Sequence, residues 1–272
     1  MTMNKPFISA GRKGGKHLAQ TRIAVKHAGI EDKTEYMEEK LLDAEQNLDR
    51  RYRVKKLINL LVSFIIFVLG VSSVIFIFRH DGDRWLTLRW LTVDGTIFTT
   101  ALSFIFIILD IIDFLKLTEH TSRNIYFMRL AASVAEALIM TVVLISQLPI
   151  FPEHMHIFRF DMFNMHILIP LLMILSFVLN DSPIGILSFR QKWNGTWYVT
   201  LYAAVIITLI LTGVIPTALI PYFFLDVTHI PLLDLAGYFL GIYGIAFLMS
   251  WLISYLNRKL SWLLLRDLDR QI

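Results

Sequence analysis

The chain has 272 residues, of which 56% are hydrophobic, and its mean hydropathy is +0.59. Apolar residues make up roughly 45–50% of a soluble domain, so this composition excludes an ordinary soluble domain and predicts an integral membrane protein. The net charge of +4 comes from cations beside apolar segments, which indicates membrane topology and not nucleic-acid binding. The absence of cysteine excludes disulfides, thiolate metal sites and cysteine nucleophiles.

The region before the first apolar segment, residues 1–56, is predicted to be a cytoplasmic tail that ends in a juxtamembrane helix. Residues 1–30 contain six Lys or Arg and no acidic residue. Apolar side chains recur at helical spacing within residues 31–49, which predicts a short amphipathic helix leading into the membrane. Two interpretations fit the basic stretch: a solvated tail, or a segment resting on anionic lipid, where each cation contributes about 1 kcal/mol.

Six segments are long and apolar enough to cross a bilayer, whose core of about 30 Å requires about 20 mostly apolar residues in a helix. They are residues 57–78, 90–115, 130–150, 162–179, 197–220 and 235–256. Lipid offers no hydrogen-bond partner to an open backbone, so each segment is expected to be helical. The sequence therefore predicts an all-α fold, a bundle of six transmembrane helices across residues 57–256.

The positions of Lys and Arg predict the orientation of these helices. Five cations stand directly before the first segment: Arg50, Arg51, Arg53, Lys55 and Lys56. Loops on the same side carry most of the other cations, whereas residues 221–231 carry none. We therefore expect a multi-pass protein of the cell membrane with both termini in the cytoplasm, including a C-terminal tail at residues 257–272.

Two polar residues are predicted to lie at similar depth near the outer interface. With both termini inside, the second and fourth segments run inward, which places Thr92 roughly 3 Å and His166 roughly 6 Å below their outer ends. A threonine hydroxyl becomes a nucleophile when a base within hydrogen-bond reach takes its proton, and histidine is the usual base near neutral pH. The alternatives are a threonine bonded within or between helices and a histidine that serves packing.

Several nearby polar residues could support such a pair. Asp94, Asp161 and Asn164 are candidates to orient the histidine. Asn164 and Tyr222 are candidates to stabilise an oxyanion, together with free N–H groups at the starts of the second and fourth segments. Spacing alone selects none of them.

Three stretches of the sequence resemble one known family. "RWLTVDGTIF" (residues 89–98) resembles the start of that family's second span, and "NMHILIP" (164–170) resembles the place where its histidine opens a later span before a proline. "IPYFFLDV" (220–227) resembles the stretch before its last span. The family is the androgen-induced-gene family of six-span membrane hydrolases, which includes the androgen-dependent TFPI-regulating protein. The similarity covers roughly residues 57–262.

The resemblance implies an enzyme that hydrolyses fatty acid esters of hydroxy fatty acids with a threonine nucleophile and a histidine. The family threonine corresponds to Thr92 and the family histidine to His166, while Asp226 falls in the third matching stretch. This interpretation predicts a lipid substrate within the bilayer, no cofactor and no nucleic-acid partner.

The predicted outer side also gathers histidines and carboxylates. They are His154, His156, Asp161, His166, Asp226, His229 and Asp234. Imidazole and carboxylate groups are ligands of zinc and other divalent ions, so a metal-assisted variant of the chemistry is an alternative. No strong ligand spacing repeats along this set, and we predict no metal site.

Three carboxylates predicted inside the membrane indicate a different function. Asp110 and Asp113 lie near the inner end of the second segment, and Glu136 lies in the third. They could form ion pairs with Arg123 and Arg129, or they could line the path of a transporter. A transporter is therefore the alternative to the hydrolase, and a non-catalytic membrane scaffold is the third hypothesis.

Small residues mark one face of the last segment. Gly237 and Gly241 form a G-x-x-x-G pattern, which lets helices approach closely. The pattern fits packing within the bundle and a homodimer equally.

Overall fold

The computed structural model describes residues 31–80, 85–116, 122–150 and 156–269. Every regular element in these ranges is a helix, which confirms the predicted all-α class. The chain divides into two units, residues 1–52 with Ile272 and residues 53–271. The first unit contributes the described helical residues 31–52, and the second contains all the remaining helices.

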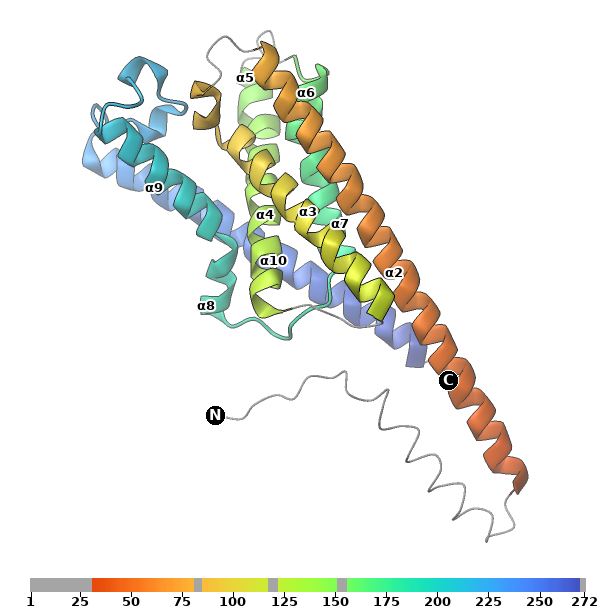
Figure 1. Ribbon diagram of the computed structural model, residues 1–272. Coiled ribbons are helices and arrows are strands. Elements are labelled where there is room, and N and C mark those ends of the chain that lie inside the picture. Colours follow the sequence, from red (N-terminus) through yellow and green to blue (C-terminus); the bar gives the residue numbers. More distant parts are fainter. Residues whose placement is uncertain (1–30, 81–84, 117–121, 151–155, 270–272) are drawn as a thin grey trace. The chain divides into compact units, whose positions relative to one another are not determined.

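Six long helices make up most of the described chain (Figure 1). They are α2 (Glu31–His80), α3 (Leu91–Lys116), α4 (Arg123–Val142), α7 (Ile169–Asn180), α9 (Trp197–Leu211) and α10 (Leu232–Asp269). The shorter pieces are η1 (Leu86–Arg89), η2 (Val143–Gln147), α5 (Leu148–Ile150), α6 (Phe160–Phe163), η3 (Asn164–Leu168), α8 (Phe189–Lys192), η4 (Trp193–Gly195), η5 (Thr217–Leu219) and η6 (Phe223–Leu225). The last helix continues past Leu256, the predicted end of its span, to Asp269.

Five helical segments in the described ranges are long and apolar enough to cross a membrane. They are Arg53–His80, Leu91–Leu115, Arg123–Ile145, Phe160–Asn180 and Leu232–Trp262. A sixth is counted only when Phe189–Gly195 and Trp197–Leu211 are taken together, and these two pieces are bent by 54°. The helices are therefore compatible with a multi-pass membrane protein.

The fifth predicted segment, residues 197–220, is broken in the structure. α9 ends at Leu211, and Gly213 adopts a positive φ of 76°. A left-handed glycine just after the last turn is a common helix terminator. Pro216 follows and cannot donate the backbone hydrogen bond that would extend the helix. The prediction of one continuous helix to Ile220 is wrong because these two residues outweigh the hydropathy of the segment.

The bend before α9 is held by α10. The Ser250 hydroxyl of α10 donates to the Lys192 carbonyl oxygen at 2.5 Å, so a carbonyl near the break has a partner. Gly195 lies so close that a Cβ there would stand 2.2 Å from Ser250 Oγ and 3.1 Å from Val134 Cγ2. Only glycine allows this approach between η4, α4 and α10.

Two of the helical segments contain a π-helical turn, and each turn ends two residues before a proline. η2 precedes Pro149, and η3 precedes Pro170. A proline inside a helix lacks an N–H, and its ring crowds the carbonyl four residues earlier. The wider π turn accommodates this defect, so α4 leads through η2 into α5, and α6 leads through η3 into α7. π turns are frequent at functional sites, and η3 carries His166.

The helix α4 packs against α3, α7 and α10 and lies between them in Figure 1. Every residue from 129 to 139 is buried. Arg129, Ser133 and Glu136 occur in this stretch at intervals of four and three, so they share one face of the helix. The interior of the second unit is therefore partly polar.

Candidate functional site

An apolar cavity of about 80 Å³ lies beside Thr92, near the start of α3. Its apolar lining includes Leu138, Val142, Val143, Val199, Leu225, Phe239 and Ile242. The polar side chains at its wall are Thr92, Gln147, Tyr202, Tyr222 and Tyr243. None of the described lining residues is charged, so the cavity suits an uncharged and mostly apolar group.

Thr92 contacts Tyr222, which belongs to the connection between α9 and α10. The Tyr222 hydroxyl lies within reach of the Thr92 hydroxyl and of the Leu91 backbone N–H, at the free amino end of α3. Burial raises the pKa of Tyr222 to about 12, and these two neighbours oppose the shift only in part. Trp90 meets the Tyr222 ring edge-on at 5.5 Å between centroids. Tyr222 is thus a neutral phenol near pH 7, which can donate a hydrogen bond but is a poor base.

Asp94 joins the start of α3 to α9. The Tyr198 hydroxyl donates to Asp94 Oδ2 at 2.8 Å. One turn later on α9, the Tyr202 hydroxyl donates to the Arg89 carbonyl oxygen. These two bonds fix the cavity wall beside Thr92. Asp94 therefore joins α3 to α9, whereas the sequence analysis suggested that it orients the histidine.

His166 lies on the π turn η3 and is 7% exposed. Its Nδ1 bonds to the Met162 carbonyl oxygen at 2.8 Å, and because a carbonyl can only accept, Nδ1 carries the proton and Nε2 keeps a lone pair. Among the described residues, His166 is not part of the cavity wall. Its neighbour Met165 packs in one apolar cluster with Val93, which follows Thr92. The structure thus brings η3 against α3 without placing the imidazole in the cavity.

Asp161 and Asn164, two further candidates, are buried beside the histidine. Arg159 donates to Asp161 Oδ1 and Oδ2 through Nε and Nη2, both at 2.6 Å. Asp161 also acts electrostatically on His166. Asn164 donates to the Ser73 hydroxyl of α2 at 3.3 Å. Asp161 is therefore the carboxylate that the structure places near the imidazole.

Asp226, from the third family-like stretch, caps a short turn. It accepts hydrogen bonds from the Thr228 hydroxyl at 2.6 Å and from the Thr228 and His229 backbone N–H groups at 3.2 Å each. These bonds favour the carboxylate and lower the pKa of Asp226. Asp226 follows Leu225 of the cavity wall, so its turn supports that wall from outside.

The histidines and carboxylates do not assemble a metal centre in the described part of the chain. No three His, Asp or Glu side chains within it are grouped closely enough to hold an ion. His154 lies outside the described residues.

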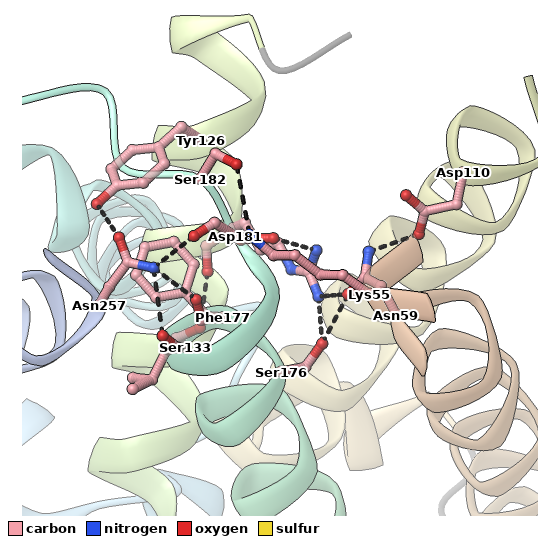
Figure 2. Close-up of polar contacts among 12 residues, drawn as sticks. Lys55, Asn59, Asp110, Tyr126, Ser133, Ser176, Phe177, Asp181, Ser182 and Asn257 are labelled. Carbon is pink, nitrogen blue, oxygen red and sulfur yellow. Dashed lines mark hydrogen bonds and ion pairs between the residues drawn. The ribbon is translucent and has the colours of Figure 1, made fainter. Parts of the chain in front are cut away.

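Asp110 and Asp113 lie toward the opposite end of α3 from Thr92. Their Oδ atoms are 3.3 and 2.8 Å from Lys56 Nζ on α2. Asn59, one turn along α2, donates to Asp110 Oδ2 at 2.5 Å (Figure 2). The cation that pairs with these carboxylates is Lys56, where the sequence suggested Arg123 and Arg129.

Arg129 instead pairs with Asp181, directly after α7, and the two side chains are 2.6 Å apart. Asn257 of α10 donates to the Asp181 carbonyl oxygen at 2.8 Å and accepts from the Tyr126 hydroxyl at 3.2 Å. A cavity of about 30 Å³ lies among Lys56, Asp110, Arg129 and Asp181. The sequence analysis did not identify Asn257. The only indication in the sequence is that this polar residue directly follows the last apolar segment.

Gly237 and Gly241 face open space in the described structure. A Cβ on either residue would meet no atom within 4 Å. Packing inside the bundle therefore does not explain the G-x-x-x-G pattern, and the homodimer stays a prediction.

Comparison of the chain with models of protein families, with curated proteins and with solved structures finds no match. The class that the fold supports is a helical protein compatible with several membrane crossings. An apolar cavity lies beside Thr92.

Proposed function

We propose that the protein is an integral membrane hydrolase of lipid esters, with Thr92 as the nucleophile and His166 as the general base. The observation that carries this proposal is the position of Thr92 on the wall of an apolar, uncharged cavity. An acyl chain is apolar and an ester is neutral, so the chain can occupy the cavity while the carbonyl lies at Thr92. The resemblance of three stretches to the androgen-induced-gene family supports the same assignment.

In the proposed reaction, His166 takes the Thr92 proton as the hydroxyl attacks the ester carbonyl, and an acyl-threonine forms. The histidine then gives that proton to the oxygen of the leaving alcohol. A water deprotonated by the histidine attacks the acyl-threonine, releases the fatty acid, and the proton returns to Thr92. His166 must act through Nε2, since Nδ1 is bonded to Met162. Tyr222 keeps its proton and can donate a hydrogen bond to the oxyanion.

Labelling with a fluorophosphonate probe tests this assignment on the purified chain. We expect the probe to label the wild-type protein, and we expect this labelling to be absent from Thr92→Ala and from His166→Ala. The matched controls are Thr208→Ala, which removes a hydroxyl bonded to its own helix, and His80→Ala, which removes an imidazole whose Nδ1 bonds to the carbonyl four residues earlier. Labelling that survives Thr92→Ala overturns the proposal, and labelling that survives only His166→Ala rejects the base while keeping the nucleophile.

The proposed setting is the cell membrane, with both termini in the cytoplasm and Thr92 near the outer interface. The placement of Lys and Arg before the first apolar segment supports this orientation. The lipid substrate would enter sideways from the bilayer, and the basic residues 1–30 would contact anionic lipid.

Cation transport is the alternative function. The ion pairs with Lys56 weigh against a path through Asp110 and Asp113. Glu136 favours it, because its carboxylate has no ion pair among the described contacts. Ion flux into liposomes that is lost on Glu136→Gln would support transport over hydrolysis.

A further inference from the structure

Glu136 is a fully buried carboxyl group near the middle of α4, with 0% of the residue exposed. The Thr99 hydroxyl of α3 donates to its Oε1 at 2.7 Å. Its second oxygen, Oε2, has no hydrogen-bond partner. Buried polar atoms in proteins are nearly always bonded, so an open carboxylate oxygen indicates a missing partner such as water or an ion.

Thr96 supplies a second open oxygen in the same region. It precedes Thr99 by one helical turn, on the same face of α3, and is also 0% exposed. Its Oγ1 has no hydrogen-bond partner either. The packed helices α3 and α4 thus each carry one buried side-chain oxygen without a hydrogen-bond partner, and the Thr99–Glu136 bond joins the two helices.

Three other carboxylates inside the second unit have cations, and the half-buried Asp94 has the Tyr198 hydroxyl as its partner. Asp110 pairs with Lys56, Asp161 with Arg159 and Asp181 with Arg129. No charged group acts on Glu136 among the described residues; the influences on it are burial and the Thr99 hydroxyl. A carboxylate taken into an apolar interior must be paired or neutralised, so Glu136 requires one positive charge that the described side chains do not supply.

We propose that Glu136, Thr99 and Thr96 form a buried binding site for one monovalent cation, either a proton or Na⁺. Both ions meet the same need, which is a single positive charge on Oε2. Hydroxyl and carboxylate oxygens are the ligands that hard cations prefer. The site is independent of the proposed hydrolysis, since Glu136 does not line the Thr92 cavity.

The surroundings of Glu136 separate this site from the two cavities. Toward Asp181, the Arg129 guanidinium lies 4.4 Å over the Phe106 ring, which closes the polar face of α4 on that side. Toward Thr92, the Ile139 side chain would lie 2.9 Å from a Cβ on Gly95. All three residues of the site, Thr96, Thr99 and Glu136, are 0% exposed, so the site is closed to solvent in this structure.

Titratable groups on the helices around α4 are engaged elsewhere. Tyr198 of α9 is within electrostatic range of Glu136, but its hydroxyl donates to Asp94. His166 of η3 bonds to Met162. A proton bound at the site is therefore carried by Glu136 itself.

The test is labelling of the full-length protein with dicyclohexylcarbodiimide, which reacts with protonated carboxyls in apolar surroundings, followed by mass spectrometry of the peptides. A proton site predicts labelling of Glu136 that falls about tenfold for each pH unit above the carboxyl pKa, in choline buffer and Na⁺ buffer alike. A Na⁺ site predicts that Na⁺, but not choline, suppresses labelling at one pH. Labelling that responds to neither pH nor Na⁺ overturns the proposal.

Infrared difference spectroscopy keeps the proposal testable if the reagent does not reach the site. In Na⁺-free buffer, a carboxylic-acid carbonyl band should be present in the wild type and absent in Glu136→Gln. Absence of that band from the wild type overturns the proposal, because the carboxylate would then be ionised without a cation.

Hydroxyl deletions test the ligands. Thr99→Val should keep Glu136 protonated to higher pH, since the hydroxyl stabilises the carboxylate. If the site binds Na⁺, Thr96→Val should weaken the suppression of labelling by Na⁺. If it binds a proton, Thr96→Val should raise the proton affinity of Glu136, as Thr99→Val does. Ser254→Ala, which removes a buried hydroxyl of α10 that donates to the Trp251 carbonyl oxygen of its own helix, is the control and should change nothing. If both threonine variants behave like the wild type, the two threonines are not ligands and the proposed site is rejected.

Discussion

Arg129 on α4 and Asp181 after α7 form an ion pair of 2.6 Å, with 3% and 12% of the two side chains exposed. The same guanidinium donates to Asn59 of α2 and to Ser176 of α7. One cation thus joins α2, α4 and α7, and its charge is balanced by a residue that no helix pattern in the sequence identified.

Asp181→Ala is expected to lower the free energy of unfolding by about 3 kcal/mol, because the Arg129 charge stays buried without its counter-ion. The value is at the low end of the range for a broken buried pair, since Asp181 keeps some contact with solvent. Denaturation in detergent micelles measures the change. Asp226→Ala, which removes a carboxylate with only local contacts, is the control and should cost clearly less. Equal losses in the two variants would show that the ion pair adds nothing to stability.

Gly70 of α2 lies against Thr100 of α3, and a Cβ on Gly70 would stand 1.9 Å from Thr100 Oγ1. We expect Gly70→Ala to push the helices apart and to lower the unfolding free energy by about 1–3 kcal/mol. Adding Thr100→Ala removes that oxygen and leaves a contact of 3.1 Å, so the double variant should recover part of the loss. Gly241→Ala should be harmless, because its Cβ meets open space. If the double variant loses as much unfolding free energy as the sum of the two single variants, Gly70 and Thr100 are not in contact.

Tyr198→Phe removes the hydroxyl that donates to Asp94 and leaves a half-buried carboxylate without that bond. We expect a loss of about 1–3 kcal/mol in unfolding free energy. Tyr198→Phe combined with Asp94→Ala should lose less than the sum of the single changes, because an unpaired acceptor no longer remains. Tyr255→Phe, at a partly exposed tyrosine of α10, is the comparison and should leave stability unchanged. A double variant that equals the sum would mean that the two side chains do not stabilise each other.

Hydropathy predicted the helices well where no backbone defect intervenes. It placed the first and last apolar segments inside α2 and α10, and the second begins one residue before α3. It failed at Gly213, where the φ of 76° ends α9. The prolines at 149 and 170 carried a signal too, since each follows a π turn, but their effect on helix geometry is visible only in three dimensions.

The pairing of polar residues could not be predicted, because it depends on rotation about each helix axis. Counting residues predicted similar depths for Thr92 and His166. It did not show that Val93, about 100° around the helix from Thr92, belongs to the cluster with Met165 of η3. The contact between Thr92 and Tyr222 depends on a connection without regular periodicity.

Lys56 shows the same limit for charges. From the sequence, Lys56 served only as one of the five cations that predict the orientation of the first helix. Arginines were proposed as partners of Asp110 because they were expected at the same depth in the membrane. In the structure, Lys56 turns toward α3 and pairs with Asp110 and Asp113. Depth alone could not distinguish Lys56 from Arg129, whose guanidinium faces Asp181.

Asp226 provides a pH-dependent readout of the turn beside the cavity. Its hydrogen bonds lower its pKa below the ordinary value of 3.8, so the stabilisation they give is present above that value and is lost as pH falls through the folded-state pKa. Hydrogen exchange at the Thr228 and His229 amides, which donate to Asp226, should therefore be slow above about pH 4 and approach unstructured-peptide rates at lower pH.

Asp226→Asn is the informative variant, because an amide can accept the same hydrogen bonds but does not titrate in this range. We expect its exchange rates at the Thr228 and His229 amides, relative to an unstructured peptide, to stay constant through the acid pH range. Tyr222 and Leu225 precede this turn in the cavity wall, so opening the turn at low pH should also raise exchange at their amides in the wild type. If the acid transition persists in Asp226→Asn, another group controls the turn and the assignment of its stability to this carboxylate is wrong.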